Sequence, residues 1–138
     1  MSPIDWAMRP LAHYADFEGR ASRSEYWWFQ LFQLIAYLVL GITFAIIGSA
    51  VGGTGSGFLT VIILIGLLML ALVIPNLAVM ARRFHDQDLS GWLILLYFIP
   101  YAGGLIIVVF MCIRGTDGPN RYGSDPFGDK RHLERVFA

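Results

Sequence analysis

The side chains best suited to chemistry lie in a short charged segment, residues 82–88, which reads RRFHDQD. Uncharged stretches flank it on both sides, from Tyr26 to Ala81 and from Leu89 to Ile113. Its two guanidinium groups have the planar donor geometry that binds phosphate and carboxylate groups. An adjacent histidine and aspartate, here His85 and Asp86, can also ligate a metal, but a zinc site needs three or four ligands.

A second group of polar residues precedes the first uncharged stretch. Arg20 and Arg23 are three residues apart, so a helical turn places them on one side. Ser22 or Ser24 can cap the helix that follows, with Glu25 in its first turn, and the aromatic residues at 26–28 predict an interfacial belt. We predict that the two arginines and Glu25 join the charged segment at the membrane interface, and that residues 120–122 join only if the tail lies on the same side. The candidate residues for binding a lipid headgroup or a protein partner are Arg20, Arg23, Glu25, Arg82, Arg83, His85, Asp86, Asn120, Arg121 and Tyr122. The alternative is that the arginines only anchor helix ends and pair with neighbouring acids.

The composition places these residues in a membrane protein. Of 138 residues, 57% are hydrophobic and 14% are charged, whereas soluble domains average about 45–50% and about 25%. Ten basic and ten acidic residues cancel, and all lie within residues 1–25, 82–88 and 114–138. A single cysteine, Cys112, excludes an internal disulfide and a Cys/His metal site. We expect no cofactor, no metal, no nucleic-acid partner and no cleaved secretory signal.

The hydropathy pattern predicts an all-α integral membrane protein with a single domain. Residues 1–25 are expected to form an interfacial segment. Within it we predict a short amphipathic helix over residues 2–15, capped by Ser2. Residues 27–51 and 58–81 are each long enough for a transmembrane helix, which needs about 20 apolar residues. The connecting segments are a glycine-rich loop at 48–57, a charged loop at 82–91 and a polar tail at 114–138.

Polar residues inside the two spans predict helix packing. Gln30 and Gln33 lie on one side of the first span and should face protein, because an unpaired amide in hydrocarbon is costly. Asn76 in the second span either meets them or bonds the backbone carbonyl that Pro75 frees. A stripe of small residues on the first span predicts a close contact with another helix, and consists of Gly41, Ala45 and Ser49.

The third apolar stretch, residues 92–113, contains Pro100, Gly103 and Gly104 near its centre, and these residues weaken a helix. The stretch either crosses the membrane with a break or turns back as a re-entrant hairpin. A crossing places five basic residues on each side, so the positive-inside rule gives no orientation. A hairpin places all ten on one side, but its non-helical backbone then needs shielding from lipid. In both cases we expect the amino-terminal segment and the charged segment to face the cytoplasm.

Three motifs stand out along the chain. They are FEGRASRSEYW at 17–27, RRFHD at 82–86 with SGW at 90–92, and residues 115–126, which carry NRYG at 120–123 and DP at 125–126. Together they resemble the bacterial inner-membrane proteins of the YhaH/YhaI type, catalogued as domain of unknown function 805. The break at Pro100 and Gly103 is similar to one in that family's last span. The resemblance implies a multi-pass protein of the bacterial inner membrane, and it implies no activity.

We therefore hypothesise a non-enzymatic membrane interaction module whose arginine-rich cluster binds anionic lipid headgroups. A membrane protein partner or a second copy of the chain is the alternative ligand. Two other functions stay open: a subunit of an oligomeric transporter or channel, and a membrane-embedded hydrolase that uses His85 and Asp86. They have less support, because no ionisable group lies inside a span and no nucleophile or phosphate-loop motif is present.

Overall fold

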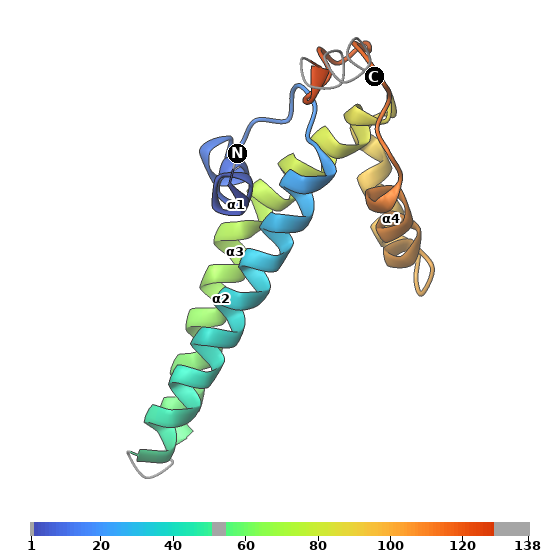
Figure 1. The fold of residues 1–138 in the computed structure, drawn as a ribbon. Coiled ribbons are helices and arrows are strands. Elements are labelled where there is room, and N and C mark those ends of the chain that lie inside the picture. The colour runs from blue at the N-terminus through green and yellow to red at the C-terminus, as the bar shows by residue number, and fades with distance from the viewer. Residues whose placement is uncertain (1, 51–54, 129–138) are drawn as a thin grey trace.

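The computed structural model describes residues 2–50 and 55–128. Its elements in chain order are α1 (Pro3–Ala12), α2 (Arg23–Ala50), α3 (Gly55–Asp86), the 3-10 helix η1 (Gly91–Phe98) and α4 (Gly103–Cys112) (Figure 1). Within the described residues, the only strand-like pairing is an isolated bridge between Asn120 and Gly123. The prediction of an all-α membrane protein is therefore confirmed.

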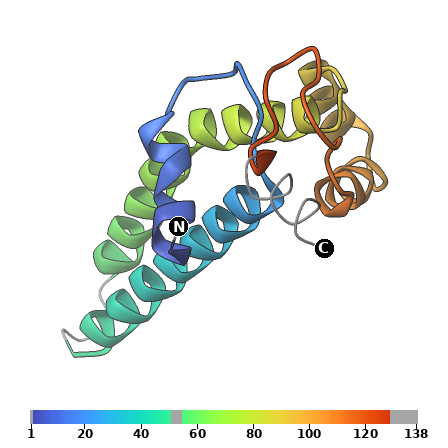
Figure 2. The ribbon, with the colours of Figure 1, turned by 45° about the horizontal axis from the view of Figure 1, so that its top comes forward.

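Helices α2 and α3 lie side by side and form the long arm of the molecule (Figures 1 and 2). Their 28 and 32 residues reach about 42 and about 48 Å, which exceeds the hydrocarbon core of about 30 Å. Many of their apolar side chains are exposed, including Ile46 at 63% and Leu70 at 69%. Such a surface is unfavourable in water, and both helices are long and apolar enough to cross a membrane.

An amide cluster joins α2 to α3. Asn76 donates a 2.8 Å hydrogen bond to Gln33 and accepts 3.0 Å bonds from both Gln30 and Gln33. Because an unpaired amide in hydrocarbon is costly, these bonds fix the register of the two helices. The predicted meeting of Asn76 with the two glutamines is confirmed. The small-residue stripe does not serve this interface, since no atom lies within 4 Å of a Cβ built on Gly41.

Helix α1 begins with the predicted cap. The Ser2 backbone N–H donates a 2.7 Å bond to the Asp5 carboxylate, and the Asp5 N–H donates a 3.2 Å bond to the Ser2 hydroxyl. The pKa of Asp5 lies below its usual value, mainly because of the bond from the Ser2 backbone. The helix continues through Pro10 to Ala12, so the break or kink that a proline can cause does not end it.

A contact between Tyr14 and α3 compensates for the proline in the second span. Pro75 cannot donate to the carbonyl four residues earlier in its helix, which is that of Ala71. The Tyr14 hydroxyl donates a hydrogen bond to this carbonyl. Tyr14 therefore satisfies the freed group, and Asn76, the predicted alternative, bonds the glutamines and the Leu72 carbonyl instead.

Residues 92–113 form a hairpin. Helix η1 leads away from the charged end, residues 99–102 turn, and α4 returns beside η1 (Figures 1 and 2). A Cβ on Gly103 would collide with the Leu96 carbonyl oxygen, so glycine permits this close approach. The Arg83 guanidinium, at the end of α3, donates to the Ile113 carbonyl. Both ends of the stretch thus lie at the same end of the molecule, which is the chain path that the hairpin alternative predicted.

Two predicted loops are shorter than expected. Helix α3 continues through Asp86, so residues 82–86 are its last turn and the predicted loop at 82–91 is wrong for them. This helical turn directs Arg83 and Asp86 towards each other at i, i+3 spacing. Of the loop predicted at 48–57, residues 48–50 and 55–57 belong to α2 and α3, and residues 51–54 lie outside the described residues.

Candidate functional site

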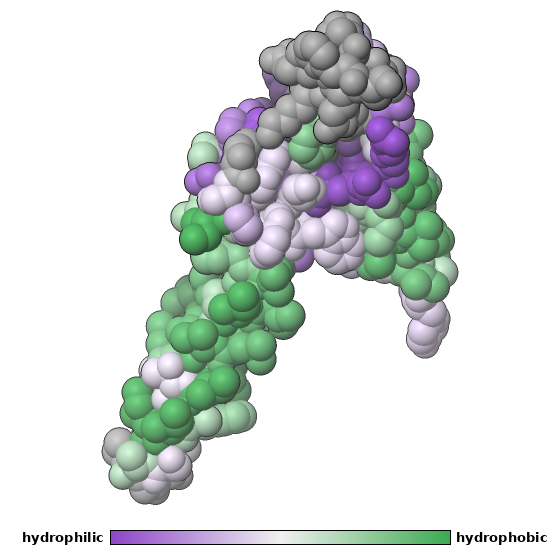
Figure 3. Space-filling model, viewed as in Figure 1, coloured by the Kyte–Doolittle hydropathy of each residue, from purple (hydrophilic) through white to green (hydrophobic). Residues whose placement is uncertain are grey.

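The charged residues gather at one end of the molecule, which we call the polar cap: residues 13–25, 82–91 and 114–128. Figure 3 shows these hydrophilic residues together above two hydrophobic arms of unequal length. A buried core lies beneath the cap where α2, α3 and α4 meet, with Phe29, Phe84 and Met111 fully enclosed. This core brings the first two motifs together, because it also contains Tyr26 of the first beside Phe84 of the second.

Asp86 is the centre of the cap. One of its carboxylate oxygens accepts a 3.0 Å hydrogen bond from Arg20 Nε and forms an ion pair with Arg20 Nη2 at 2.9 Å. The other oxygen pairs with Arg83. All three side chains are buried, so the carboxylate is shared by two guanidinium groups out of contact with water. Such charge-assisted bonds are among the strongest hydrogen bonds in proteins.

The same arginines bind the tail to the cap. Arg20 donates to the carbonyl oxygens of Gly118 at 2.6 Å and Thr116 at 2.7 Å. The Thr116 backbone N–H and hydroxyl donate to the Asp86 carbonyl at 2.8 and 3.0 Å. The tail therefore follows the end of α3, because its backbone groups form hydrogen bonds with Arg20 and with the Asp86 carbonyl there.

Gly115 allows this path, because a Cβ at that position would collide with the Asp86 carboxylate. Sequence reasoning did not single out Thr116 or Gly118, which act largely through backbone carbonyls that any residue type supplies.

A second ion pair lies beside the first. The Glu25 carboxylate is fully buried and faces Arg82 at 3.0 Å and Arg9 at 3.7 Å. Neither carboxylate oxygen has a well-aligned hydrogen bond, so the pairing is chiefly an attraction between charges. The Ser22 hydroxyl caps α2 at the Glu25 backbone N–H, 3.1 Å away, as one of the two predicted serine caps.

The NRYG motif does join the cluster. Asn120 donates a 2.9 Å bond to the His85 carbonyl. The Tyr122 ring stacks on the His85 ring, with centroids 3.9 Å apart and planes 4° from parallel. Arg121 lies over the Tyr122 ring at 4.9 Å and pairs with Asp88 at 3.2 Å. These contacts connect the tail to the charged segment on the outer side of the cap.

The histidine and aspartate considered for a hydrolase have other partners. The Nδ1 of His85 lies 3.2 Å from the Gly19 carbonyl oxygen, which can only accept a hydrogen bond. Asp86 has both oxygens bound by arginines. Among the described residues, no three His, Cys, Asp or Glu side chains form a group that could hold a metal.

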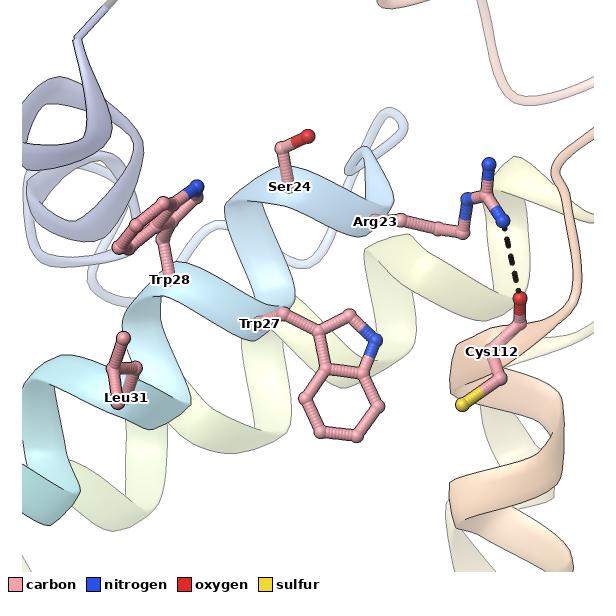
Figure 4. A pocket seen from close by; sticks show the side chains of 6 residues that line it. All are labelled: Arg23, Ser24, Trp27, Trp28, Leu31 and Cys112. Atoms are coloured by element: carbon pink, nitrogen blue, oxygen red, sulfur yellow. Dashed lines mark hydrogen bonds between the residues drawn. The ribbon is translucent and has the colours of Figure 1, made fainter.

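Arg23 differs from Arg20, Arg82 and Arg83 because its side chain is exposed. It lines an open groove of about 610 Å³ between the start of α2 and the end of α4 (Figure 4). Its guanidinium makes one long hydrogen bond, 3.4 Å, to the Cys112 carbonyl. The groove is lined by Arg23, Ser24, Trp27, Trp28, Leu31 and Cys112. Sequence reasoning assigned the tryptophans to an interfacial belt, but it did not place Cys112 opposite them.

A family model described as "Protein of unknown function (DUF805)" matches residues 14–124, a range that contains the first two motifs, the NRYG part of the third, both long helices and the hairpin. The chain belongs to this family. Inner membrane protein YhaH of Escherichia coli (strain K12) is 46% identical over 123 residues, which cover 89% of this chain and 97% of that protein. Inner membrane protein YhaI of the same strain is 40% identical over 89% of this chain and 96% of its own length.

No solved structure matches the chain. The DUF805 membership confirms the resemblance found from the three motifs. The names of these relatives, together with two helices long enough to cross a membrane, support the inner membrane as the location of this DUF805 protein.

Proposed function

We propose that this DUF805 protein is a multi-pass, non-enzymatic membrane module that binds the phosphate group of an anionic lipid at Arg23. The observation that carries the proposal is the difference between the five predicted arginines. Arg20, Arg82 and Arg83 are buried and paired with Asp86 or Glu25. Arg23 and Arg121 are exposed. Arg121 is paired with Asp88, whereas the Arg23 guanidinium makes only a long bond to the Cys112 carbonyl among the described residues, so it can take an external anion.

The surroundings of Arg23 suit a lipid better than a soluble anion. Trp27, Trp28 and Leu31 continue the groove from Arg23 along α2 towards the apolar arm (Figure 4). Tryptophan is enriched at the level of lipid headgroups because it combines an apolar ring with a polar N–H. A phosphate at the guanidinium would therefore have its acyl chains beside apolar side chains.

A second arginine is available near the first. Arg23 and Arg114 line a smaller hollow of about 190 Å³ with Gly115. The pair of Arg114 with Asp117, at 3.3 Å, is largely exposed, and exposed pairs contribute only about 0–1 kcal/mol. Arg114 can therefore turn towards a phosphate at little cost and add to its binding.

The experiment compares Arg23→Gln with Arg121→Gln, which removes the same charge from another exposed site of the cap. Each protein is purified in detergent, and retained phosphatidylglycerol and phosphatidylcholine are measured by mass spectrometry. One basic side chain near a headgroup contributes about 1 kcal/mol, which corresponds to about fivefold in affinity. We expect this loss of phosphatidylglycerol for Arg23→Gln and wild-type retention for Arg121→Gln.

Two further arms complete the test. Inorganic phosphate added to the wild type should not displace the lipid if the apolar groove contributes to binding, whereas displacement would show a site for free phosphate. Equal phosphatidylglycerol retention by Arg23→Gln and wild type, with an unchanged helical circular dichroism spectrum, would refute the proposal.

A further inference from the structure

The hairpin of η1 and α4 is about half as long as a membrane is thick. Its two helices have 8 and 10 residues, which reach about 16 and about 15 Å at 2.0 and 1.5 Å per residue. The hydrocarbon core is about 30 Å thick. A hairpin that starts at the polar cap therefore ends near the bilayer centre and occupies one leaflet only.

The hairpin is built for contact with lipid. Its side chains are mostly apolar and exposed, with Phe98 at 82% and Leu105 at 69% exposure. Near its tip, backbone N–H groups bond within the turn, from Ala102 to Pro100 at 2.8 Å and from Gly103 to Ile99 at 3.0 Å. Backbone groups in hydrocarbon need such internal partners, so the tip is suited to that environment.

The base of the hairpin is fixed to the cap. Gln87 donates to the Phe110 carbonyl, and Arg83 donates to the Ile113 carbonyl. Phe84 and Phe110 pack with their ring centroids 5.8 Å apart. These contacts hold the hairpin against the cap. Its apolar side chains therefore stay in the membrane leaflet next to the cap.

The two leaflets then face different cross-sections of the protein. Far from the cap, the described residues form only the α2–α3 arm, whereas near the cap η1 and α4 add a second, shorter arm (Figures 1 and 3). Two further helices of similar width about double the cross-section on the cap side. An inclusion that is wider in one leaflet fits best where that leaflet is stretched, which is the convex side of a curved membrane.

We propose that this protein is a one-leaflet wedge that prefers membranes curved convexly towards its polar cap. The partner of the hairpin surface is the acyl-chain layer of the cap-side leaflet. The inference rests on the two-span topology proposed above, but it is independent of the lipid site at Arg23. Its test therefore first establishes the topology and then measures the curvature preference.

The sidedness test uses Cys112, the single cysteine of the chain, which is exposed at the end of α4. A membrane-impermeant maleimide labels it in oriented membranes and in vesicles. Ser2→Cys and Ser49→Cys, each combined with Cys112→Ser, report the two ends of the α2–α3 pair. We expect Cys112 to label from the same side as position 2. Labelling of Cys112 from the side of position 49 would overturn the hairpin and with it the wedge.

The curvature test reconstitutes the full chain into a mixture of small sonicated and large extruded vesicles. Protein density on single vesicles is measured separately for cap-outward and cap-inward molecules, distinguished by maleimide labelling. We expect cap-outward molecules to be enriched on small vesicles by at least about twofold, equivalent to about 0.4 kcal/mol, and cap-inward molecules to be depleted. Equal densities on both vesicle sizes would overturn the proposal.

Matched variants separate the hairpin from the polar cap as the cause. The first variant replaces exposed side chains of the hairpin by alanine, at Trp92, Phe98 and Leu105. The second replaces exposed side chains of α2 and α3 at the end of their arm that is far from the cap, at Ile46, Phe58 and Leu59. The wedge predicts a weaker curvature preference for the first variant and a stronger one for the second. If both variants keep the wild-type preference, the cap alone causes it and the hairpin proposal fails.

Discussion

Replacing Asp86 by asparagine tests whether a single buried carboxylate holds the polar cap together. The wild-type carboxylate accepts from Arg20 through one oxygen and from Arg83 through the other. Asparagine has nearly the same shape but only one acceptor oxygen, and its NH₂ group is a donor. One guanidinium would therefore lose its acceptor and face another donor, and neither arginine would have a counter-charge at this position.

The burial of the three groups sets the size of the effect. Arg20, Arg83 and Asp86 are exposed by 7%, 0% and 3%, so water cannot replace the lost interaction. Removing one partner of a buried pair destabilises a protein by about 3–5 kcal/mol. At about 2–4 °C per kcal/mol for a chain near this length, the melting temperature should fall by about 6–20 °C.

The assay is unfolding in mixed micelles with increasing dodecyl sulfate, followed by tryptophan fluorescence and circular dichroism. Arg121→Gln is the control, because its pair with Asp88 is exposed and should contribute only about 0–1 kcal/mol. Limited proteolysis should also cut Asp86→Asn within residues 114–128 faster than wild type, since this part of the tail binds the Asp86 carbonyl and the arginines. If Asp86→Asn loses no more stability than Arg121→Gln, the carboxylate does not organise the cap.

Two glycines give further predictions in the same unfolding assay. Gly115→Ala should lower the free energy of unfolding by about 1–3 kcal/mol and expose the tail to protease, because its Cβ would collide with the Asp86 carboxylate; unchanged stability would show that the tail does not pass so close. Gly103→Ala should destabilise by a similar amount, because its Cβ would meet the Leu96 carbonyl. The neighbouring Gly104→Ala is the control, since nothing lies within 4 Å of its Cβ, and it should be neutral or stabilising by about 0.5–1 kcal/mol. Equal effects at both positions would contradict the observed hairpin.

Several features of the fold follow from short-range patterns and were predicted correctly. Ser2 and Ser22 cap helices because a hydroxyl reaches a backbone N–H three residues later. The spacing of Gln30 and Gln33 places both amides on one side of a helix, and hydrocarbon leaves them no partner except another polar group such as Asn76. These caps and amide contacts follow from the geometry of a helix and from its hydrocarbon surroundings. The amino-acid sequence is therefore enough to predict them.

The contacts of the polar cap could not be predicted in the same way. Arg20 and Asp86 are 66 residues apart in sequence, and the charged groups near Asp86 allow many pairings. Sequence reasoning placed Arg23 and Arg82 in one cluster as equivalent cations. In the structure Arg82 lies against Glu25 and Arg23 lies in an open groove. Arg82 lies where α3 packs against α2, whereas Arg23 lies on the side of α2 that faces the end of α4.

The sequence by itself determined the membrane character of this DUF805 protein, its two long helices and the three motifs by which it resembles its family, because hydropathy and helix spacing act locally. It left open whether residues 92–113 cross or return, since Pro100 and Gly103 break a helix in either case. Only the tertiary structure decided this, by placing the Ile113 carbonyl at Arg83 and the Thr116 N–H at the Asp86 carbonyl. Buried charges and backbone groups need partners, and these partners exist only when the tail lies at the same end as the charged segment.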